Sequence, residues 1–450
     1  MKTLFGTDGI RGEAGKFPLD EATVRIIGSS LASYLKNSSG KTPSIVIGRD
    51  TRESGPWLEA ALIEGAASAG ADCLSAGVIT TPGVAYLTRV KDADAGVVIS
   101  ASHNPYHDNG IKIFAPSGRK IADTVERKIE ADIFAQAADR GDFKANVSAS
   151  ANELELRKSY ENFLAGEIAD GLNLAGLKLV VDCANGASSE IAPALFKKLG
   201  ADVLAINAAP DGKNINLNCG SLHIESLQKK TLTERADLGI AFDGDADRSL
   251  FVDSKGNFID GDGALWVLAQ QLQDRHQLKE NTVVATVMSN IGLEIALRSR
   301  GIELIRTDVG DKYVLEELLR RGVSLGGEQS GHIIFPELSL AGDGMITSLC
   351  LLRAMVEARK SLADLVGGFE HYPQTLLNVR VREKIPFEQL PTVQEAAKQV
   401  EEQLSQNGRL LLRYSGTEPL ARVMIEGANQ NEIESYAEKI ASQIRQEIGA

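Results

Sequence analysis

Three aspartates alternate in one short segment of the sequence, at Asp243, Asp245 and Asp247. The segment lies between the apolar runs 238–242 and 249–252, which predict two buried strands. Carboxylates held this close repel one another unless they are neutralised, so a bound divalent cation is the simplest explanation. Ligation by oxygen alone favours Mg²⁺ or Ca²⁺. A solvated acidic turn is the alternative, but it does not explain why two buried strands flank the segment so closely.

An EF-hand calcium loop does not fit this segment. Arg248 occupies the place of the invariant turn glycine, and Ser254 that of the bidentate glutamate. Mg²⁺ usually completes its octahedron with phosphate oxygens and water. A phosphorylated side chain elsewhere in the chain can therefore supply a remaining ligand.

Ser102 is the candidate for that side chain. The apolar run 95–99 predicts a short strand that leads into Ser-Ala-Ser-His-Asn-Pro at 100–105. Open α/β sheets bind ligands at the carboxyl ends of their strands, so this position suits a nucleophile. A plain turn is the commoner interpretation of such a cluster taken alone. A serine hydrolase is disfavoured, because the sequence has no GxSxG elbow and His103 is too near in sequence to be placed as the base.

A third polar segment, Gly-Gly-Glu-Gln-Ser-Gly-His at 326–332, suits sugar hydroxyls. Glu328 can accept hydrogen bonds from two neighbouring hydroxyls, and Ser330 and His332 add a hydroxyl and an imidazole. The alternative for this segment is a polar loop beside a capped strand.

A fourth segment combines the groups that bind phosphate. It holds two guanidinium groups, at Arg413 and Arg422, and two hydroxyls, at Ser415 and Thr417. Gly416 between the hydroxyls lets backbone amides approach an anion. Helix capping or a surface turn explains Ser415 or Thr417 separately, but not the full cluster.

The elements that must position these segments follow one pattern that occurs three times. Each copy is a short apolar strand, a polar loop, a helix and a second strand that begins after a glycine, over residues 44–74, 179–204 and 283–305. Strands that alternate with helices in this way predict βαβ units on largely parallel sheets. The alternative is that the copies are similar by chance, since any α/β chain contains several strand–helix–strand segments.

Two stretches predict breaks between domains. The apolar period is lost over 144–153, and Gly367-Gly368 closes a helix-like segment. After the second break, 376–381 reads as a strand, and a closing helix has one apolar face. The residues of that face are Ile433, Tyr436, Ala437, Ile440, Ile444 and Ile448.

We therefore predict an α/β protein. It has three repeated α/β domains with mixed, largely parallel sheets and a smaller C-terminal α+β domain, because 450 residues are too many for one core. The predicted domains are 1–152 with the Ser102 segment, 153–255 with the aspartates, 256–368 with the Glu328 segment and 369–450 with the Arg413 segment.

The composition excludes several classes of protein. A formal net charge of −13 and the absence of a basic patch argue against a nucleic acid as partner. The N-terminus lacks a signal peptide, and no apolar run reaches the roughly 20 residues of a spanning helix, so we expect a cytoplasmic protein without a membrane partner. The cysteines have no CxxC spacing, and we expect reduced structural thiols at Cys73, Cys183, Cys219 and Cys350.

Together the four segments resemble those of the α-D-phosphohexomutase superfamily. Its phosphoserine, metal, sugar and phosphate loops occur here in the same order across essentially the whole chain. Phe-Gly-Thr-Asp-Gly-Ile-Arg-Gly at 5–12, the 100–105 segment and Gly-Glu-Gln-Ser-Gly-His at 327–332 are similar to the bacterial branch that acts on glucosamine phosphates. The resemblance implies four domains around one central active-site cleft.

The resemblance also implies a role for each matching residue. Tyr414 departs from the pattern, because many members have proline there; a tyrosine leaves the phosphate contacts intact but does not pre-set the loop's φ angle. The implied magnesium ligands are Ser102, as the phosphoserine, with Asp243, Asp245 and Asp247. The implied residues near the reacting oxygens are Arg11, Lys112 and His332; the implied substrate-binding residues are Arg248, Glu328, Ser330, Arg413, Ser415, Gly416, Thr417 and Arg422.

The expected reaction moves a phosphoryl group between two oxygens of one sugar. Phospho-Ser102 donates to O1 of glucosamine 6-phosphate, the 1,6-bisphosphate turns over, and its 6-phosphoryl group returns to the serine. Positioning and electrostatics dominate phosphoryl transfer, which gives roles to Mg²⁺, Lys112 and Arg248. Lys112 or His332, assisted by Arg11, is the candidate base. A sugar 1,6-bisphosphate is the expected activator, and amino-sugar nucleotide and cell-wall precursor synthesis the expected use.

Several alternatives remain open at this stage. A phosphomannomutase or phosphoglucomutase differs by few contacts, and Gln329 favours glucosamine. From another class, a magnesium-dependent sugar phosphatase would release phosphate to water. A silent sugar-phosphate sensor is disfavoured, because Ser102 and all three aspartates occur together. The expected partner is an amino-sugar phosphate, and the sequence does not decide between a monomer and a homodimer.

Overall fold

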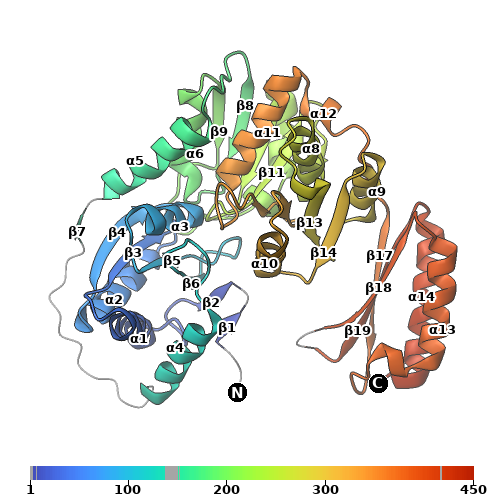
Figure 1. Ribbon diagram of the computed structural model, residues 1–450, viewed down its shortest axis with the longest axis horizontal. Helices are drawn as coiled ribbons and strands as arrows, with labels where there is room; N and C mark the ends of the chain where they lie inside the picture. Colours follow the sequence, from blue (N-terminus) through green and yellow to red (C-terminus); the bar gives the residue numbers. More distant parts are fainter. Residues whose placement is uncertain (1–3, 7, 137–149, 152, 416–417) are drawn as a thin grey trace. The chain divides into compact units, whose positions relative to one another are not determined.

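The chain forms two compact units in a computed structural model. One unit comprises the residues up to Val287 together with Ile305–Val366, and the other comprises Met288–Leu304 together with Gly367–Ala450. The structure describes residues 4–6, 8–136, 150–151, 153–415 and 418–450. Figure 1 shows the chain coloured along its sequence.

The first sheet of the larger unit has seven strands in the order β1-β2-β6-β5-β3-β4-β7. Parallel pairing joins β3 to β4 and β5, whereas β6 runs antiparallel to both β5 and β2, so the sheet is mixed. The strands are β1 (Phe5–Gly6), β2 (Gly9–Glu13), β3 (Ser44–Arg49), β4 (Asp72–Val78), β5 (Ala95–Ile99), β6 (Asp108–Phe114) and β7 (Ser150–Ala151).

Four helices accompany this sheet. They are α1 (Glu21–Ser39), α2 (Gly55–Ser68), α3 (Thr81–Val90) and α4 (Asp123–Gln136). Helices α1 and α2 lie unusually close: a Cβ atom at Gly28 would be 2.2 Å from the Leu62 carbonyl oxygen, and one at Gly65 2.0 Å from that of Arg25. Glycine is therefore required at both positions of this helix crossing.

The second sheet has five strands in the order β12-β11-β10-β8-β9. Its strands β10 and β11 are buried along their whole length, as expected for strands covered on both faces. The strands are β8 (Lys178–Asp182), β9 (Asp202–Ile206), β10 (Leu238–Phe242), β11 (Ser249–Asp253) and β12 (Phe258–Ile259). The helices are α5 (Glu153–Phe163), continued by the π-helical η1 (Leu164–Ile168), α6 (Ser188–Lys198), the 3₁₀ turn η2 (Gly220–Leu222) and α7 (Glu225–Glu234).

The third sheet has four strands in the order β14-β13-β15-β16. The strands are β13 (Thr282–Thr286), β14 (Glu303–Thr307), β15 (Gly326–Gly327) and β16 (Ile333–Ile334). The helices of this region are α8 (Gly261–Asp274), the 3₁₀ turn η3 (Lys279–Asn281), α9 (Ile291–Ser299), α10 (Asp311–Arg321), α11 (Gly344–Ala358) and α12 (Leu362–Leu365).

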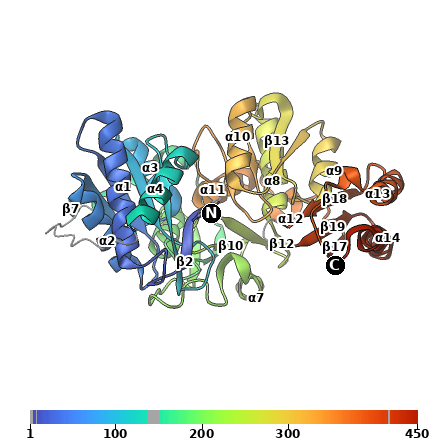
Figure 2. The ribbon, with the colours of Figure 1, turned by 90° about the horizontal axis from the view of Figure 1, so that it is seen from below.

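The C-terminal part of the smaller unit is an antiparallel sheet in the order β17-β19-β18, with helices on one face, as Figures 1 and 2 show. Its elements are β17 (Gln374–Arg380), the 3₁₀ turn η4 (Phe387–Gln389), α13 (Pro391–Leu404), β18 (Arg409–Tyr414), β19 (Leu420–Glu426) and α14 (Gln430–Ile448). The predicted apolar face of the closing helix is confirmed, since α14 buries Ile433, Ala437, Ile440, Ile444 and Ile448.

A buried carboxylate explains why α9 belongs to this smaller unit. Glu426 at the end of β19 is fully buried and accepts hydrogen bonds from the backbone N–H of Ile291, at 3.1 Å, and from Nε of Arg409, at 2.9 Å. An anionic acceptor at the N-terminus of a helix is favoured by the helix dipole. The contact ties the start of α9 to the C-terminal sheet.

The three predicted copies of the repeat are confirmed as strand–helix–strand units. They are β3–α2–β4, β8–α6–β9 and β13–α9–β14, and the first two pairs of strands are parallel. Of the predicted linker at 144–153, residues 144–149 and 152 lie outside the described residues. At the second predicted break, the smaller unit resumes at Gly367.

The cysteines are unpaired, as predicted: Cys73, Cys183 and Cys219 are buried and Cys350 is partly buried. In the described part of the chain, no helix combines the length and the apolar character needed to cross a bilayer.

Asp343 is a buried carboxylate that caps α11. It accepts hydrogen bonds from the backbone N–H of Met345, at 2.8 Å, and of Ile346, at 3.1 Å. The Tyr160 hydroxyl donates to its other oxygen at 2.7 Å. Burial raises the pKa of Asp343 from 3.8 to about 6, because it outweighs these hydrogen bonds.

We predict that Asp343→Asn stabilises the protein at neutral pH. The unfolded wild-type chain loses the Asp343 proton near pH 4 and the folded chain only near pH 6, so stability falls as the pH rises through this window. Asparagine caps as well as aspartate and does not ionise. Relative to wild type, the variant should be up to about 3 kcal/mol more stable above pH 6 than it is below pH 4, measured as the difference between the two free energies of unfolding at each pH. An equal difference at both pH values would contradict the prediction.

Candidate active site

Ser102 lies just beyond the carboxyl end of β5, as predicted, and is fully buried. Its φ angle is +52°, in the left-handed region that residues other than glycine seldom adopt. Its Oγ donates a hydrogen bond to Oδ2 of Asp243 at 2.6 Å and lies 3.3 Å from Nδ1 of His103. The structure therefore brings the predicted nucleophile into contact with the first predicted metal ligand.

The three aspartates lie in the turn that joins the antiparallel strands β10 and β11. All are buried, and one oxygen from each lies within 4.8 Å of the others. One oxygen of Asp245 and one of Asp247 are buried without a hydrogen-bond partner. Buried carboxylate oxygens that converge without donors fit a hard divalent cation such as Mg²⁺.

The electrostatics of the turn support this interpretation. Burial, followed by repulsion from Asp247 and Asp245, raises the pKa of Asp243 well above its usual value. Burial alone would also raise the pKa of Asp247, but Lys112 and His332 outweigh it and hold that pKa well below its usual value. The cluster is thus only partly neutralised by side chains.

Lys112, on β6, supplies much of that neutralisation. Its buried Nζ lies 2.8 Å from Oδ2 of Asp245, 3.0 Å from Oδ2 of Asp8 and 3.4 Å from Oδ2 of Asp247. Burial alone would lower the pKa of Lys112, but these carboxylates together raise it well above its usual value. In this arrangement Lys112 is a positive charge held beside Asp245 and Asp247 of the aspartate turn.

His332, just before β16, extends the network of charges. Its Nδ1 lies 3.6 Å from Oδ2 of Asp247, and its Nε2 lies 3.7 Å from Oδ2 of Asp311 at the start of α10. Asp311 also pairs with Lys120 at 2.8 Å, and Lys120 pairs with Asp8 at 2.7 Å. Burial would lower the pKa of His332, yet the carboxylates raise it to about 9.

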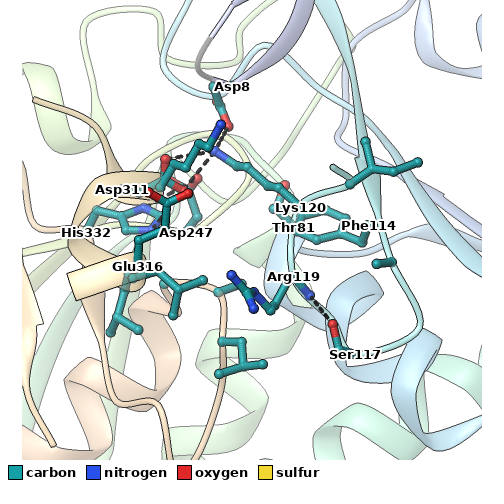
Figure 3. A pocket seen from close by; sticks show the side chains of 18 of the residues that line it. Asp8, Thr81, Phe114, Ser117, Arg119, Lys120, Asp247, Asp311, Glu316 and His332 are labelled. Atoms are coloured by element: carbon teal, nitrogen blue, oxygen red, sulfur yellow. Dashed lines mark hydrogen bonds and ion pairs between the residues drawn. The ribbon is translucent and has the colours of Figure 1, made fainter. Parts of the chain in front are cut away.

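A cavity of about 470 Å³ opens beside this network (Figure 3). Asp8, Lys120, Asp311 and His332 form one side of it, and the Arg119 side chain extends into it. Its volume lies in the range typical of small-molecule sites. The charged groups around the aspartate turn are therefore accessible to a small ligand.

Two guanidinium groups lie near Ser102. Arg11 donates to Asp8 at 2.5 Å and to Oδ1 of Asn104 at 3.4 Å, and NH1 of Arg248 lies 3.2 Å from Nδ1 of His103. Burial and the Arg248 charge lower the pKa of His103 to about 4, so its imidazole is neutral at pH 7. Both arginines suit the charge that develops on a transferring phosphoryl group.

The predicted sugar-binding residues follow β15 in the same compact unit as Ser102. Glu328 accepts a hydrogen bond from the backbone N–H of Gly310 at 3.2 Å. The Ser330 hydroxyl donates to its other oxygen at 3.5 Å, which leaves acceptor capacity on Glu328 for hydroxyls of a ligand.

The predicted phosphate loop belongs to the other compact unit, so its approach to Ser102 remains a prediction. Arg413 and Arg422 are direct partners on the neighbouring strands β18 and β19. Burial and the Arg422 charge lower the pKa of Arg413, as expected for two neighbouring cations, and NH2 of Arg422 lies 3.8 Å from Oε2 of Glu418. Ser415 follows β18, whereas Gly416 and Thr417 lie outside the described residues.

Tyr414 is held by two contacts. Its ring stacks on Phe387 at a centroid distance of 4.4 Å, and its hydroxyl donates to the Ile385 carbonyl oxygen at 2.5 Å. Stacking and a hydrogen bond anchor the start of the loop, where proline would have restricted φ instead.

Sequence reasoning missed several residues of this site. Thr81, at the start of α3, donates its hydroxyl to Oδ2 of Asp245 at 2.5 Å. Lys120 and Asp311 are ordinary charged residues in the sequence, and no motif distinguishes them. Asp8 lies in the 5–12 segment that carried the resemblance, three residues before Arg11, and that position was the one indication in the sequence that it belongs to the site.

Comparison with known proteins identifies the family. Models of the phosphoglucomutase/phosphomannomutase family match in order: alpha/beta/alpha domain I over residues 2–140, domain II over 158–256, domain III over 260–372 and the C-terminal domain over 376–443. A phosphoglucosamine mutase from Solibacter usitatus is 50% identical over 448 residues, which cover 100% of this chain and 99% of that protein. The chain belongs to the phosphoglucomutase/phosphomannomutase family. The predicted superfamily and fold class are thereby confirmed.

Solved structures of other proteins share the fold. A family protein from Burkholderia thailandensis superposes with a TM-score of 0.81 at 24% identity, over 99% of this chain and 98% of that one. The N-acetylphosphoglucosamine mutase of Aspergillus fumigatus, in complex with GlcNAc-6P and magnesium, gives a TM-score of 0.63 at 17% identity, over 99% and 96% of the two chains.

We predict opposite effects of Asp243→Asn on stability and on Mg²⁺ binding. In EDTA the variant should unfold at the same temperature as wild type or higher, because it removes a repelled charge. Its affinity for Mg²⁺ should fall by more than about 100-fold, beyond the loss typical of removing an outer-shell partner. Thermal melts with and without Mg²⁺ report both effects without an assay of activity.

The matched control is Asp211→Asn, which changes an exposed aspartate of the same sheet region. Mg²⁺ should raise the melting temperature of wild type and of the control by the same amount. An equal gain in Asp243→Asn would contradict a metal site in the aspartate turn.

Proposed function

We propose that this chain interconverts glucosamine 6-phosphate and glucosamine 1-phosphate through a phosphoserine at Ser102. It is thus an isomerase, an intramolecular phosphotransferase. One observation supports the proposal above all: Oγ of Ser102 lies 2.6 Å from Asp243, in a buried cluster with Asp245, Asp247 and Lys112. The phosphoglucosamine mutase that is 50% identical along the whole chain supports the choice of sugar.

In the first half-reaction, the bond between phosphorus and Oγ of Ser102 breaks as a bond forms to O1 of glucosamine 6-phosphate. The proton of the O1 hydroxyl passes to a base, and a 1,6-bisphosphate results. In the second half-reaction the bisphosphate presents its 6-phosphoryl group, the bond between phosphorus and O6 breaks as a bond to Oγ of Ser102 forms, and O6 takes up the proton from the base. Atoms balance over the cycle, and the product is glucosamine 1-phosphate.

The buried cations carry the electrostatic part of the reaction. Lys112, which pairs with Asp245, and Arg248, whose guanidinium lies 3.2 Å from Nδ1 of His103, hold positive charge around the aspartate turn, where the transferring phosphoryl group would develop negative charge. Mg²⁺ bound by Asp243, Asp245, Asp247 and a phospho-Ser102 oxygen would neutralise further charge on that group. Lys112 or His332, with Arg11 assisting, is the proposed base for the hydroxyl proton, and either group must first release its own proton, because the neighbouring carboxylates raise the pKa of both.

The cofactor and cellular context extend the same proposal. Mg²⁺ is the proposed metal, and the related Aspergillus fumigatus enzyme, solved with magnesium and GlcNAc-6P, supports that choice. A sugar 1,6-bisphosphate is the proposed activator. We place the reaction in the cytoplasm, where its product would supply amino-sugar nucleotide and cell-wall precursor synthesis. A homodimer stays a prediction, to be checked by light scattering.

Glu328→Gln tests the proposed sugar contacts. A carboxylate that accepts from sugar hydroxyls makes charge-assisted hydrogen bonds, each worth about 1.5–3 kcal/mol. We expect kcat/KM for glucosamine 6-phosphate to fall by about 10- to 100-fold. The control is Glu337→Gln, an exposed glutamate of the same region, which should leave kcat/KM unchanged. Equal values of kcat/KM for the two variants would contradict a contact between Glu328 and the sugar.

A ³¹P NMR time course tests the function itself. The protein is supplied with Mg²⁺, a trace of glucose 1,6-bisphosphate and glucosamine 6-phosphate, beside parallel samples with the glucose and mannose esters. We expect the glucosamine ester to be converted fastest to its 1-phosphate, and Ser102→Ala to abolish conversion. Faster conversion of the glucose or mannose ester would show that the chain prefers that sugar. Release of inorganic phosphate alone would show that the chain is a phosphatase.

A further inference from the structure

Arg52 is a buried guanidinium in the loop after β3, with 1% of its surface exposed. Its Nε pairs with Oδ2 of Asp50 at 2.9 Å, and Asp50 is fully buried as well. Moving two charges out of water costs free energy that a well-packed apolar pair would not cost. The position of this ion pair therefore calls for an explanation beyond the stability of the fold.

The guanidinium donates its remaining hydrogen bonds to one short segment. NH1 donates to the carbonyl oxygen of Pro105 at 2.5 Å, and NH2 donates to the carbonyl oxygens of Ser102 and Asn104, both at 2.9 Å. Hydrogen bonds from a charged donor are stronger than neutral ones, and the planar guanidinium fixes their directions. Arg52 thus holds three carbonyl groups of the loop that carries the nucleophile.

Asp50, the other member of the ion pair, is linked to Ser102 through the Ser100 hydroxyl. Oδ2 of Asp50 accepts a hydrogen bond from the Ser100 hydroxyl at 2.6 Å, and that hydroxyl accepts from the backbone N–H of Ser102 at 2.9 Å. Asn216 adds a second donor to the Ser102 carbonyl oxygen at 2.9 Å. Both backbone polar groups of Ser102 are therefore bound to one buried network.

This network accounts for the unusual backbone of Ser102. A positive φ in a residue with a side chain persists only when the surrounding contacts determine it, and Ser102 has a φ of +52°. We infer that Arg52, Asp50 and Ser100 are positioning residues that hold Ser102 in this conformation, so that its Oγ meets Asp243 at 2.6 Å. The inference rests on the proposed function, because it concerns the nucleophile of that reaction.

Loss of these positioning residues should slow the phosphoryl-transfer step and leave substrate binding unchanged. All three residues are buried, and none of them lines the cavity beside the aspartate turn. Their loss should displace Ser102 without changing the groups that bind the sugar phosphate. A small misplacement of a reacting group lowers the rate strongly, so the effect should fall on kcat rather than on KM.

Ser100→Ala is the sharpest test, because it removes one hydroxyl from the network. We expect kcat to fall by about 10- to 100-fold, with KM for glucosamine 6-phosphate within about threefold of wild type. Transfer from phosphorylated enzyme to the sugar in a single turnover should slow by the same factor. The control is Thr88→Ala, which removes another buried hydroxyl of the same sheet region, one that donates to the Val84 carbonyl oxygen at 2.7 Å.

The control variant should keep wild-type kcat while losing a similar amount of thermal stability. A second pair, Arg52→Lys and Arg52→Met, should show partial rescue of kcat by lysine, which keeps the charge beside Asp50. Ser100→Ala with the kcat of the control, or with a change in KM alone, would overturn the inference. A wild-type protein without mutase turnover would instead refute the proposed function, and the inference with it.

Discussion

The structure around Ser102 depends on the burial of three carboxylates in one turn. Asp243, Asp245 and Asp247 repel one another, and Lys112 pairs with Asp245 and Asp247. The remaining unpartnered oxygens point to a cation that side chains do not provide. An incompletely neutralised site of this kind binds a metal ion and a phosphoryl group together, because each supplies charge that the other lacks.

The surrounding fold serves to keep this turn and the serine in contact. Ser102 follows a strand of the first sheet, and the aspartates join two strands of the second sheet, so two sheets contribute one side each. Thr81 and Lys112 from the first sheet region bind Asp245 directly. These contacts hold the aspartate turn against the sheet that carries Ser102, and the proposed phosphoryl transfer depends on that distance.

Much of this arrangement could be predicted from the sequence, and the reason is local. The apolar run 95–99 predicted that Ser102 lies at the carboxyl end of a strand, and the apolar runs on either side of the Asp243 segment predicted a turn between two buried strands. The network of Arg52 and Asp50 could not be predicted in the same way. Its residues lie about 50 positions from Ser102 and contact it only through the fold, and a buried arginine looks in sequence like an exposed one. Lys120 and Asp311 escaped prediction for the same reason.

The most direct test of the account is whether Ser102 carries the phosphoryl group during turnover. The enzyme is first phosphorylated with glucose 1,6-bisphosphate and then mixed rapidly with glucosamine 6-phosphate, and the peptide that contains Ser102 is followed by mass spectrometry. If Ser102 is the carrier, phosphate should leave Ser102 at a rate no slower than kcat and appear first in a glucosamine bisphosphate. Phosphate that stays on Ser102 throughout turnover, or that is carried by another residue, would contradict it.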